Sequence, residues 1–69
     1  MPLSFAEKGT PQVIRHIGGT PEIKKHLEDL GLNVGGDVTV INVFGDNLIV
    51  KVKGSRIALS SELAKKILI

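Results

Sequence analysis

The feature that most constrains this fold is a long valine- and isoleucine-rich stretch that is broken once by a short polar turn. Asp37–Phe44 and Leu48–Lys53 are both rich in residues that favour β-strands, and Gly45-Asp46-Asn47 between them has the composition of a turn. The pattern predicts a long antiparallel hairpin. A chain of 69 residues has room for only one domain around such a hairpin.

The apolar positions of the first of these strands change phase along its length. Val38 and Val40 lie on one face, whereas Ile41 and Val43 lie on the other. A bulge near residue 40 explains this change, because an extra residue re-aims the side chains that follow it. Bulges of this kind bend the long strands of small barrels.

A short helix is predicted after Gly18-Gly19. Thr20 is a suitable N-cap, Pro21 suits the first helical position, and Glu22 suits the positive end of the helix. Gly31 is the expected C-terminal stop. The helix carries one apolar stripe, at i, i+4 and i+7: Ile23, Leu27 and Leu30.

The start of the chain predicts one helical turn and one strand. Ser4 and Glu7 have capping-box spacing before Gly9, with Leu3 and Phe5 expected to pack inward. Residues 12–17 are expected to form a strand after Pro11, whose missing N–H suits a strand start.

The end of the chain predicts a short strand, a helical turn and a last strand. Arg56–Leu59 follows the turn at Gly54-Ser55, Ser60 or Ser61 caps the final turn, and Ile67–Ile69 closes the chain. The whole pattern predicts a mainly β domain with short helices. We expect a small SH3-like barrel of about five strands, with one main helix after strand 1 and helical turns near both ends, as a single domain over residues 1–69.

The residue types argue against an enzyme or a metal site. There is no cysteine, and the two histidines, His16 and His26, are far apart and have no third ligand at metal-binding spacing. Serines are better explained as caps and turns than as nucleophiles. No phosphate-binding glycine motif is present. We therefore expect no catalytic residues, no cofactor and no metal ligands.

The charge balance leaves a basic binding module open. Nine Lys and Arg against seven Asp and Glu give a net charge of +2. Lys51, Lys53 and Arg56 cluster around one hairpin, so a small barrel that binds RNA or DNA is an alternative. The chain has no Trp or Tyr on which bases could stack, and its two phenylalanines, Phe5 and Phe44, are expected to be engaged in packing. Both points disfavour that alternative.

Four segments carry short motifs in a fixed order: residues 25–35, 45–46, 48–54 and 57–69. The first contains Leu30-Gly31-Leu32, the second is Gly45-Asp46, the third is a valine-rich strand, and the last contains Ala58-Leu59. In this order they resemble the FeoA family. Its signature Arg-x-x-Leu-x-x-Leu-Gly-Leu-x-Pro-Gly has Val34 here in place of the proline. Its hairpin Pro-x-Gly-Asp-Pro has Asn47 in place of the last proline, and its closing Ala-Leu-Arg has Ser60 in place of the arginine.

The resemblance implies a cytoplasmic accessory protein of bacterial ferrous iron uptake, with an SH3-like fold and no enzymatic activity. Its implied partner is the membrane permease FeoB, at that protein's cytosolic GTP-binding portion. The same domain ends DtxR-type repressors, so an isolated repressor C-terminal domain is a second alternative, although no DNA-binding segment precedes the domain here. No apolar run approaches the ~20 residues that span a bilayer.

The partner surface is predicted from exposed basic and apolar positions. Ile49 is out of phase with Leu48, Val50 and Val52 and is expected on the outer face, although packing under the N-terminal turn or the last strand is the alternative. The candidate partner-binding residues are Ile49, Lys51, Lys53, Lys24, Lys25 and His26.

Overall fold

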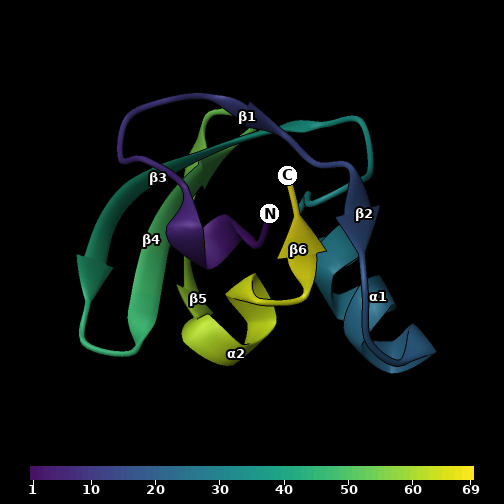
Figure 1. The fold of residues 1–69 in the computed structure, drawn as a ribbon. Helices are drawn as coiled ribbons and strands as arrows, with labels where there is room; N and C mark the ends of the chain where they lie inside the picture. The colour runs from purple at the N-terminus through teal and green to yellow at the C-terminus, as the bar shows by residue number, and fades with distance from the viewer.

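The computed structural model describes all 69 residues, Met1–Ile69 (Figure 1). The predicted hairpin, the main helix and the two terminal turns are all present. The elements follow in the order η1 (Leu3–Phe5), β1 (Gln12–Val13), β2 (His16–Ile17), α1 (Pro21–Asp29), β3 (Asp37–Phe44), β4 (Asn47–Val52), β5 (Ser55–Ser60), α2 (Ser61–Ala64) and β6 (Ile67–Leu68).

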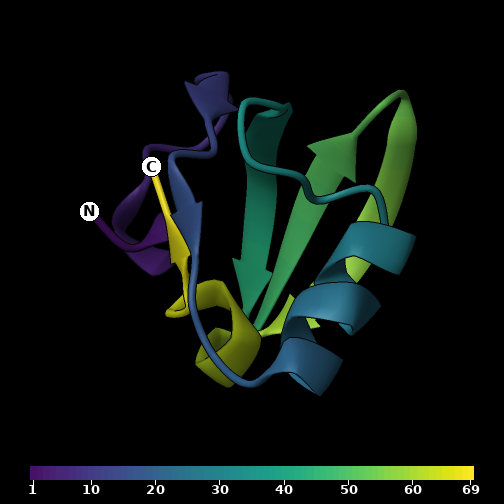
Figure 2. The same cartoon turned by 90° about the vertical axis from the view of Figure 1, so that its right-hand side faces the viewer.

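The strands form two antiparallel sheets. One has four strands in the order β1-β3-β4-β5, and the other pairs β2 with β6. The two sheets do not close into a full barrel, and α1 stands on the open side, in front of β5 in Figure 2. The predicted mainly β, SH3-like fold is confirmed.

The strand predicted over residues 12–17 is two short strands, because the chain passes from one sheet to the other within it. Ile14 donates its N–H to the carbonyl of Gly36 at 2.9 Å, beside β3, whereas Arg15 donates to the carbonyl of Leu68 in β6 at 2.7 Å. The structure therefore has six strands rather than five.

The core is entirely aliphatic, and no polar or charged residue is buried. It draws on every layer of the fold, from η1 to β6. The buried residues are Leu3, Ile14, Ile17, Leu27, Leu32, Val38, Val40, Leu48, Val50, Val52, Leu59, Ala64 and Ile67.

Helix α1 begins and ends as its sequence predicts. The side-chain oxygen of Thr20 accepts from the N–H of Ile23 at 3.3 Å, and Pro21 occupies the first turn. Gly31 has φ 97°. A Cβ at Gly31 would also lie 3.2 Å from Cγ1 of Val52, so this glycine lets the helix end lie close to the sheet.

The predicted bulge is present, but the faces expected beyond it are wrong. Val40 pairs with Val50, and the register then shifts so that Val43 pairs with Leu48. Directly paired residues share a face, so Val43 lies on the inward row at the rim of the sheet and not on the face of Ile49. Ile41 is the extra residue, since an inserted residue resets the alternation that follows it.

Two expectations for the N-terminus are also wrong. Phe5 is 72% exposed, whereas Leu3 is fully buried. At three residues per turn, Leu3 and Phe5 of η1 cannot lie on one side of a single 3₁₀ turn. Ser4 does not cap the turn, because Pro2 occupies the N-cap position, and the Ser4 hydroxyl is buried without a hydrogen-bond partner.

Candidate interaction surface

One face of the four-stranded sheet is free of other elements. In Figures 1 and 2, η1, both helices and the β2–β6 pair all lie on the other side of the sheet. Leu48, Val50 and Val52 of β4 point toward those elements and are buried. The alternate residues of β4 therefore point outward.

The outward residues form three cross-strand rows, which we call the outer sheet face. The register fixes each row, since directly paired residues project from the same side of a sheet. The rows are Phe44–Asn47–Ser60, Asn42–Ile49–Ala58 and Thr39–Lys51–Arg56.

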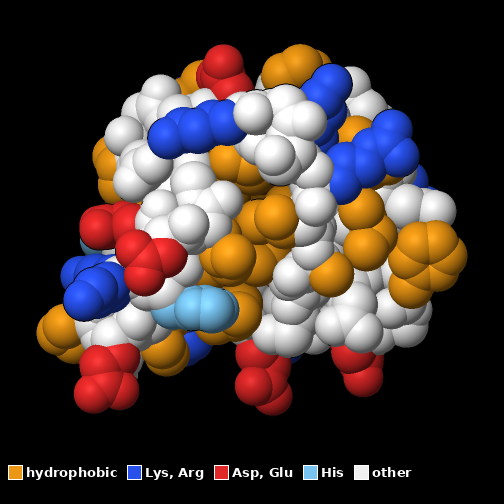
Figure 3. Space-filling view, turned by 180° about the vertical axis from the view of Figure 1, so that it is seen from behind, with side chains coloured by type: hydrophobic (Ala, Val, Ile, Leu, Met, Phe, Trp, Pro, Cys, Tyr) orange, Lys and Arg blue, Asp and Glu red, His pale blue; other side chains and the backbone are white.

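The apolar side chains of the outer sheet face lie in its middle row and at one end, where they alternate with Asn42, Asn47 and Ser60. Ile49 is half-buried between Asn42 and Ala58, and Ala58 is exposed. Phe44, at the hairpin end, is 61% exposed, so it does not pack inward as its aromatic character suggested. In Figure 3, the back view, hydrophobic side chains lie at the right, on the side of the β3–β4 hairpin. Exposed apolar residues grouped on one face are typical of protein interaction sites.

The other end of the face is basic. Lys51 and Arg56 are directly paired across β4 and β5, and both are exposed. Neither side chain takes part in the side-chain hydrogen bonds of the structure. Lysine and arginine side chains lie above the hydrophobic ones in Figure 3. The face thus offers apolar contact area next to unpaired positive charge.

The structure brings together only part of the predicted partner-binding set. Ile49 and Lys51 lie in neighbouring rows of the outer sheet face. Lys53 is exposed in the β4–β5 turn, where its Cδ is 3.7 Å from the position of a Cβ built on Gly31. The remaining three are exposed on α1, on the other side of the sheet: Lys24, Lys25 and His26.

Two contributors to the face are absent from that predicted set. Phe44 was expected in the core, and Arg56 was noted only as a neighbour of the two hairpin lysines. The pairing of Arg56 with Lys51 follows from a two-residue turn at Lys53-Gly54, which has φ 51° and φ 80°. A Lys-Gly pair between two strand patterns was the sequence signal for that register.

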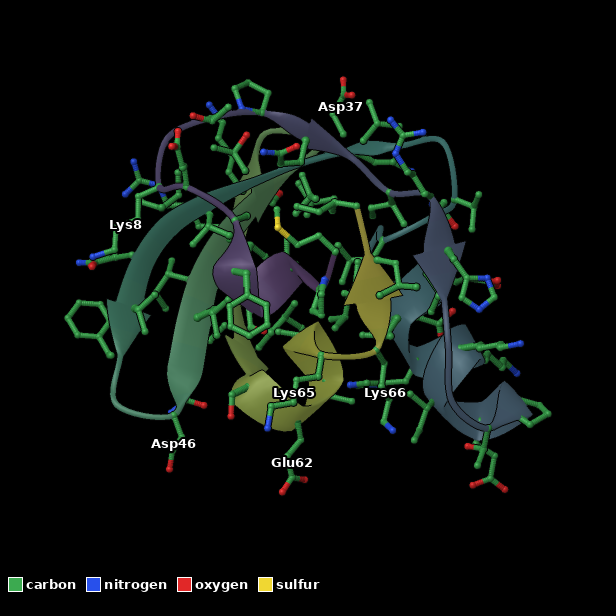
Figure 4. All side chains as sticks on the ribbon, viewed as in Figure 1. Lys8, Asp37, Asp46, Glu62, Lys65 and Lys66 are labelled. Atoms are coloured by element: carbon green, nitrogen blue, oxygen red, sulfur yellow. The ribbon has the colours of Figure 1, made fainter.

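The chain has no cluster of metal-ligating side chains. No three His, Cys, Asp or Glu residues lie together, and no pocket is present. His16 and His26 are exposed on β2 and α1. Charged side chains such as Asp37, Asp46 and Glu62 point away from the molecule in Figure 4. Neither helix has the length and apolar character needed to cross a membrane.

Comparison with known proteins identifies relatives along the whole chain. The FeoA domain profile matches residues 1–69. A putative Fe(2+) transport protein A of Methanocaldococcus jannaschii is 32% identical over 68 residues, which are 99% of this chain and 83% of that protein.

Two solved structures have a similar fold and sequence. The FeoA protein of Chlorobium tepidum is 26% identical, with a TM-score of 0.89 over 99% of this chain and 67% of that one. Stenotrophomonas maltophilia FeoA is 28% identical, with a TM-score of 0.83 over 99% and 87%. The latter is described, in complex with zinc, as a prokaryotic SH3 domain protein that possibly acts as a ferrous iron transport activating factor.

Proposed function

This chain belongs to the FeoA family, and we propose that it is a non-catalytic accessory protein of ferrous iron uptake. It acts in the cytoplasm as a single protein-interaction domain. Its partner is the FeoB permease, which it binds at the cytosolic GTP-binding portion. Ferrous iron is the cargo of the permease and not a ligand of this domain.

The observation that carries this proposal is the outer sheet face. It is the uncovered side of the sheet, and it combines apolar side chains with the unpaired charges of Lys51 and Arg56. Interfaces between proteins have an apolar centre and a polar rim. Ile49 lies in the centre of the face, between Asn42 and Ala58, so it is the residue whose contact with a partner should matter most.

Lys51 and Arg56 give this contact an electrostatic component. Positive charge at the rim of an interface steers an acidic partner and makes the association rate depend on salt. We therefore expect Ile49 to contribute mainly to the affinity of the complex, and Lys51 and Arg56 mainly to its association rate. Lys53 extends the same basic rim, and the exposed residues of α1 lie outside this surface.

Titration against a purified FeoB cytosolic GTP-binding portion tests the proposal. Calorimetry with no nucleotide, with GDP and with a non-hydrolysable GTP analogue would measure the affinity in each state. We expect saturable binding in at least one nucleotide state. No binding in any of the three would contradict the proposed partner.

Ile49→Glu tests the surface. We expect it to weaken binding by about tenfold or more, since a charge in the apolar centre of an interface is costly to desolvate. Val34→Glu is the matched control, because Val34 is 63% exposed in the loop between α1 and β3 and away from the outer sheet face. Both variants should keep the parent melting temperature within a few degrees. Unfolding of the Ile49 variant would place this side chain in the core, and unchanged binding would remove it from the interface.

A further inference from the structure

Strand β5 is an open edge of the four-stranded sheet. It pairs with β4 on one side and with no strand on the other. Edge strands leave a row of backbone N–H and C=O groups free to pair with another chain. Arg56 and Ala58 in this strand are exposed, so the edge is accessible where they lie.

The hairpin geometry identifies which groups are free. Lys53 and Gly54 both have positive φ, 51° and 80°, as in a two-residue type I′ turn, so Val52 and Ser55 form a hydrogen-bonded pair. Hydrogen-bonded and non-hydrogen-bonded pairs alternate along an antiparallel ladder.

The alternation leaves two residues of β5 with their backbone directed away from β4. They are Arg56 and Ala58, which stand in the non-hydrogen-bonded pairs with Lys51 and Ile49. No turn, loop or cap hydrogen bond reaches either residue. Their N–H and C=O groups are therefore unpaired at exposed positions.

The charges beside this edge are of one sign. Lys51 and Arg56 are direct cross-strand neighbours, an arrangement that destabilises a sheet unless a negative charge is near. The sequence between Asp46 and Glu62 contains no acidic residue. A carboxylate on a strand added beside β5 would lie next to Arg56, as a further member of the cross-strand row that contains Lys51 and Arg56, and would offset their positive charge.

The inward side of the edge is apolar. Ile57 of β5 and Leu30 at the end of α1 are half-buried hydrophobic residues packed against the core. In Figure 3 hydrophobic side chains gather in the middle of the molecule, between α1 and the sheet. An added strand would therefore meet positive charge on one face and aliphatic surface on the other.

We propose that β5 binds an extended acidic segment of a partner protein as an additional strand, with a carboxylate beside Arg56 and an apolar side chain beside Ile57. Addition of a strand to a sheet edge takes its affinity from backbone hydrogen bonds and its specificity from alternate side chains. The proposal goes beyond the proposed function, because it holds whichever protein supplies the segment.

The charges also disfavour the simplest competing occupant, which is a second copy of this chain. If β5 paired with β5 of a second copy in the register that sets Arg56 opposite Arg56, the Lys51–Arg56 row of one copy would lie next to the same row of the other. Like charges in neighbouring positions of a sheet are destabilising, and lysine-type charges are a common means of preventing edge-to-edge association. The edge therefore favours a negatively charged strand over β5 of a second copy.

Amide hydrogen exchange with a synthetic peptide tests this proposal. The probe is a capped Glu-Val repeat of eight residues, and the control is the Lys-Val repeat of the same length. We expect the Glu-Val peptide to slow exchange of the Arg56 and Ala58 amides by about tenfold or more, while the already bonded Ile57 amide changes less. The Lys-Val peptide should leave all three unchanged.

Two variants separate the contribution of side-chain charge to peptide binding from that of backbone hydrogen bonds. Arg56→Glu removes the like-charge pair with Lys51, so it should fold at least as stably, bind the Glu-Val peptide about tenfold more weakly and bind the Lys-Val peptide instead. Ala58→Pro removes one outward N–H without breaking a bond to β4, so it should weaken binding of the Glu-Val peptide. Lys65→Glu, an exposed charge reversal after α2, should bind as the parent does.

Three results would overturn the proposal. The first is saturable peptide binding that leaves the Arg56 and Ala58 amides unprotected, and the second is no binding at millimolar peptide. The third is protection of the two amides that rises with the concentration of the protein alone, which would assign the edge to a second copy.

Discussion

Replacing Leu27 with alanine measures how much of the stability of this domain depends on α1. Leu27 is fully buried, and it is the only residue of α1 that is. Ile23 and Leu30, its neighbours on the apolar stripe, are only half-buried. Truncating a fully buried leucine removes its transfer free energy and leaves a cavity, which together cost about 2–5 kcal/mol.

That cost is large for a chain of 69 residues. At roughly 0.05–0.15 kcal/mol per residue, the whole domain should have a free energy of unfolding of about 3–10 kcal/mol. The loss should lower the melting temperature by roughly 10 °C or more, since about 4–8 °C corresponds to 1 kcal/mol in domains of this size. If the free energy of unfolding of the parent lies in the lower part of that range, the variant would be largely unfolded.

Far-ultraviolet circular dichroism is the appropriate assay, because the chain has no Trp or Tyr for fluorescence. Urea titration of the parent, Leu27→Ala and Leu30→Ala would give the three free energies of unfolding. The half-buried Leu30 is the matched control, and its truncation should cost clearly less. A Leu27 variant that melts within a few degrees of the parent would refute the assignment of this residue as the anchor between α1 and the sheet.

Two further predictions concern Gly31 and iron. Gly31→Ala should lower the free energy of unfolding, measured by urea titration, by about 1–2 kcal/mol or more, because φ 97° strains an L-residue and the new Cβ would press on Val52. Gly35→Ala is the control. Gly35 has φ 86° but open space around its Cβ position, so its replacement should show the cost of the backbone strain alone. Anaerobic calorimetry with Fe²⁺ should show at most weak, non-stoichiometric binding, since no cluster of metal-ligating side chains exists. A tight one-to-one complex that disappears on changing His16 or His26 would contradict this.

Local signals in the sequence predicted α1 well. Thr20, Pro21 and Gly31 each act on the helix turn next to them, so these signals depend on neighbouring residues and not on the rest of the fold. The N-cap of α2 is Ser60, one of the two serines predicted for this position for the same reason. The bulge in β3 was predicted because its residues change phase within the strand itself.

The composition of the outer sheet face could be predicted only in part, because it depends on pairing between distant residues. The phase change indicated a bulge but not which residue would be left unpaired, and a shift of one residue moves every later side chain to the other face. Val43 was therefore assigned to the wrong face. Exposure of Phe5 and Phe44 was missed because aromatic character predicts burial on average and says nothing about a strand end or a single turn.

The outer sheet face and the β5 edge meet at Arg56, so one partner could use both. The two contacts make different demands on the partner. The face needs apolar side chains of any conformation opposite Ile49, whereas the edge needs an extended backbone that hydrogen-bonds to Arg56 and Ala58. Ile49→Glu acts on the face alone, whereas Ala58→Pro removes backbone pairing at the edge and makes only a small change to a side chain at the border of the face. A partner that lost affinity with the first variant and kept it with the second would lie across the face without extending the sheet. Equal losses with both would mean that the added strand and the apolar contact belong to one continuous interface.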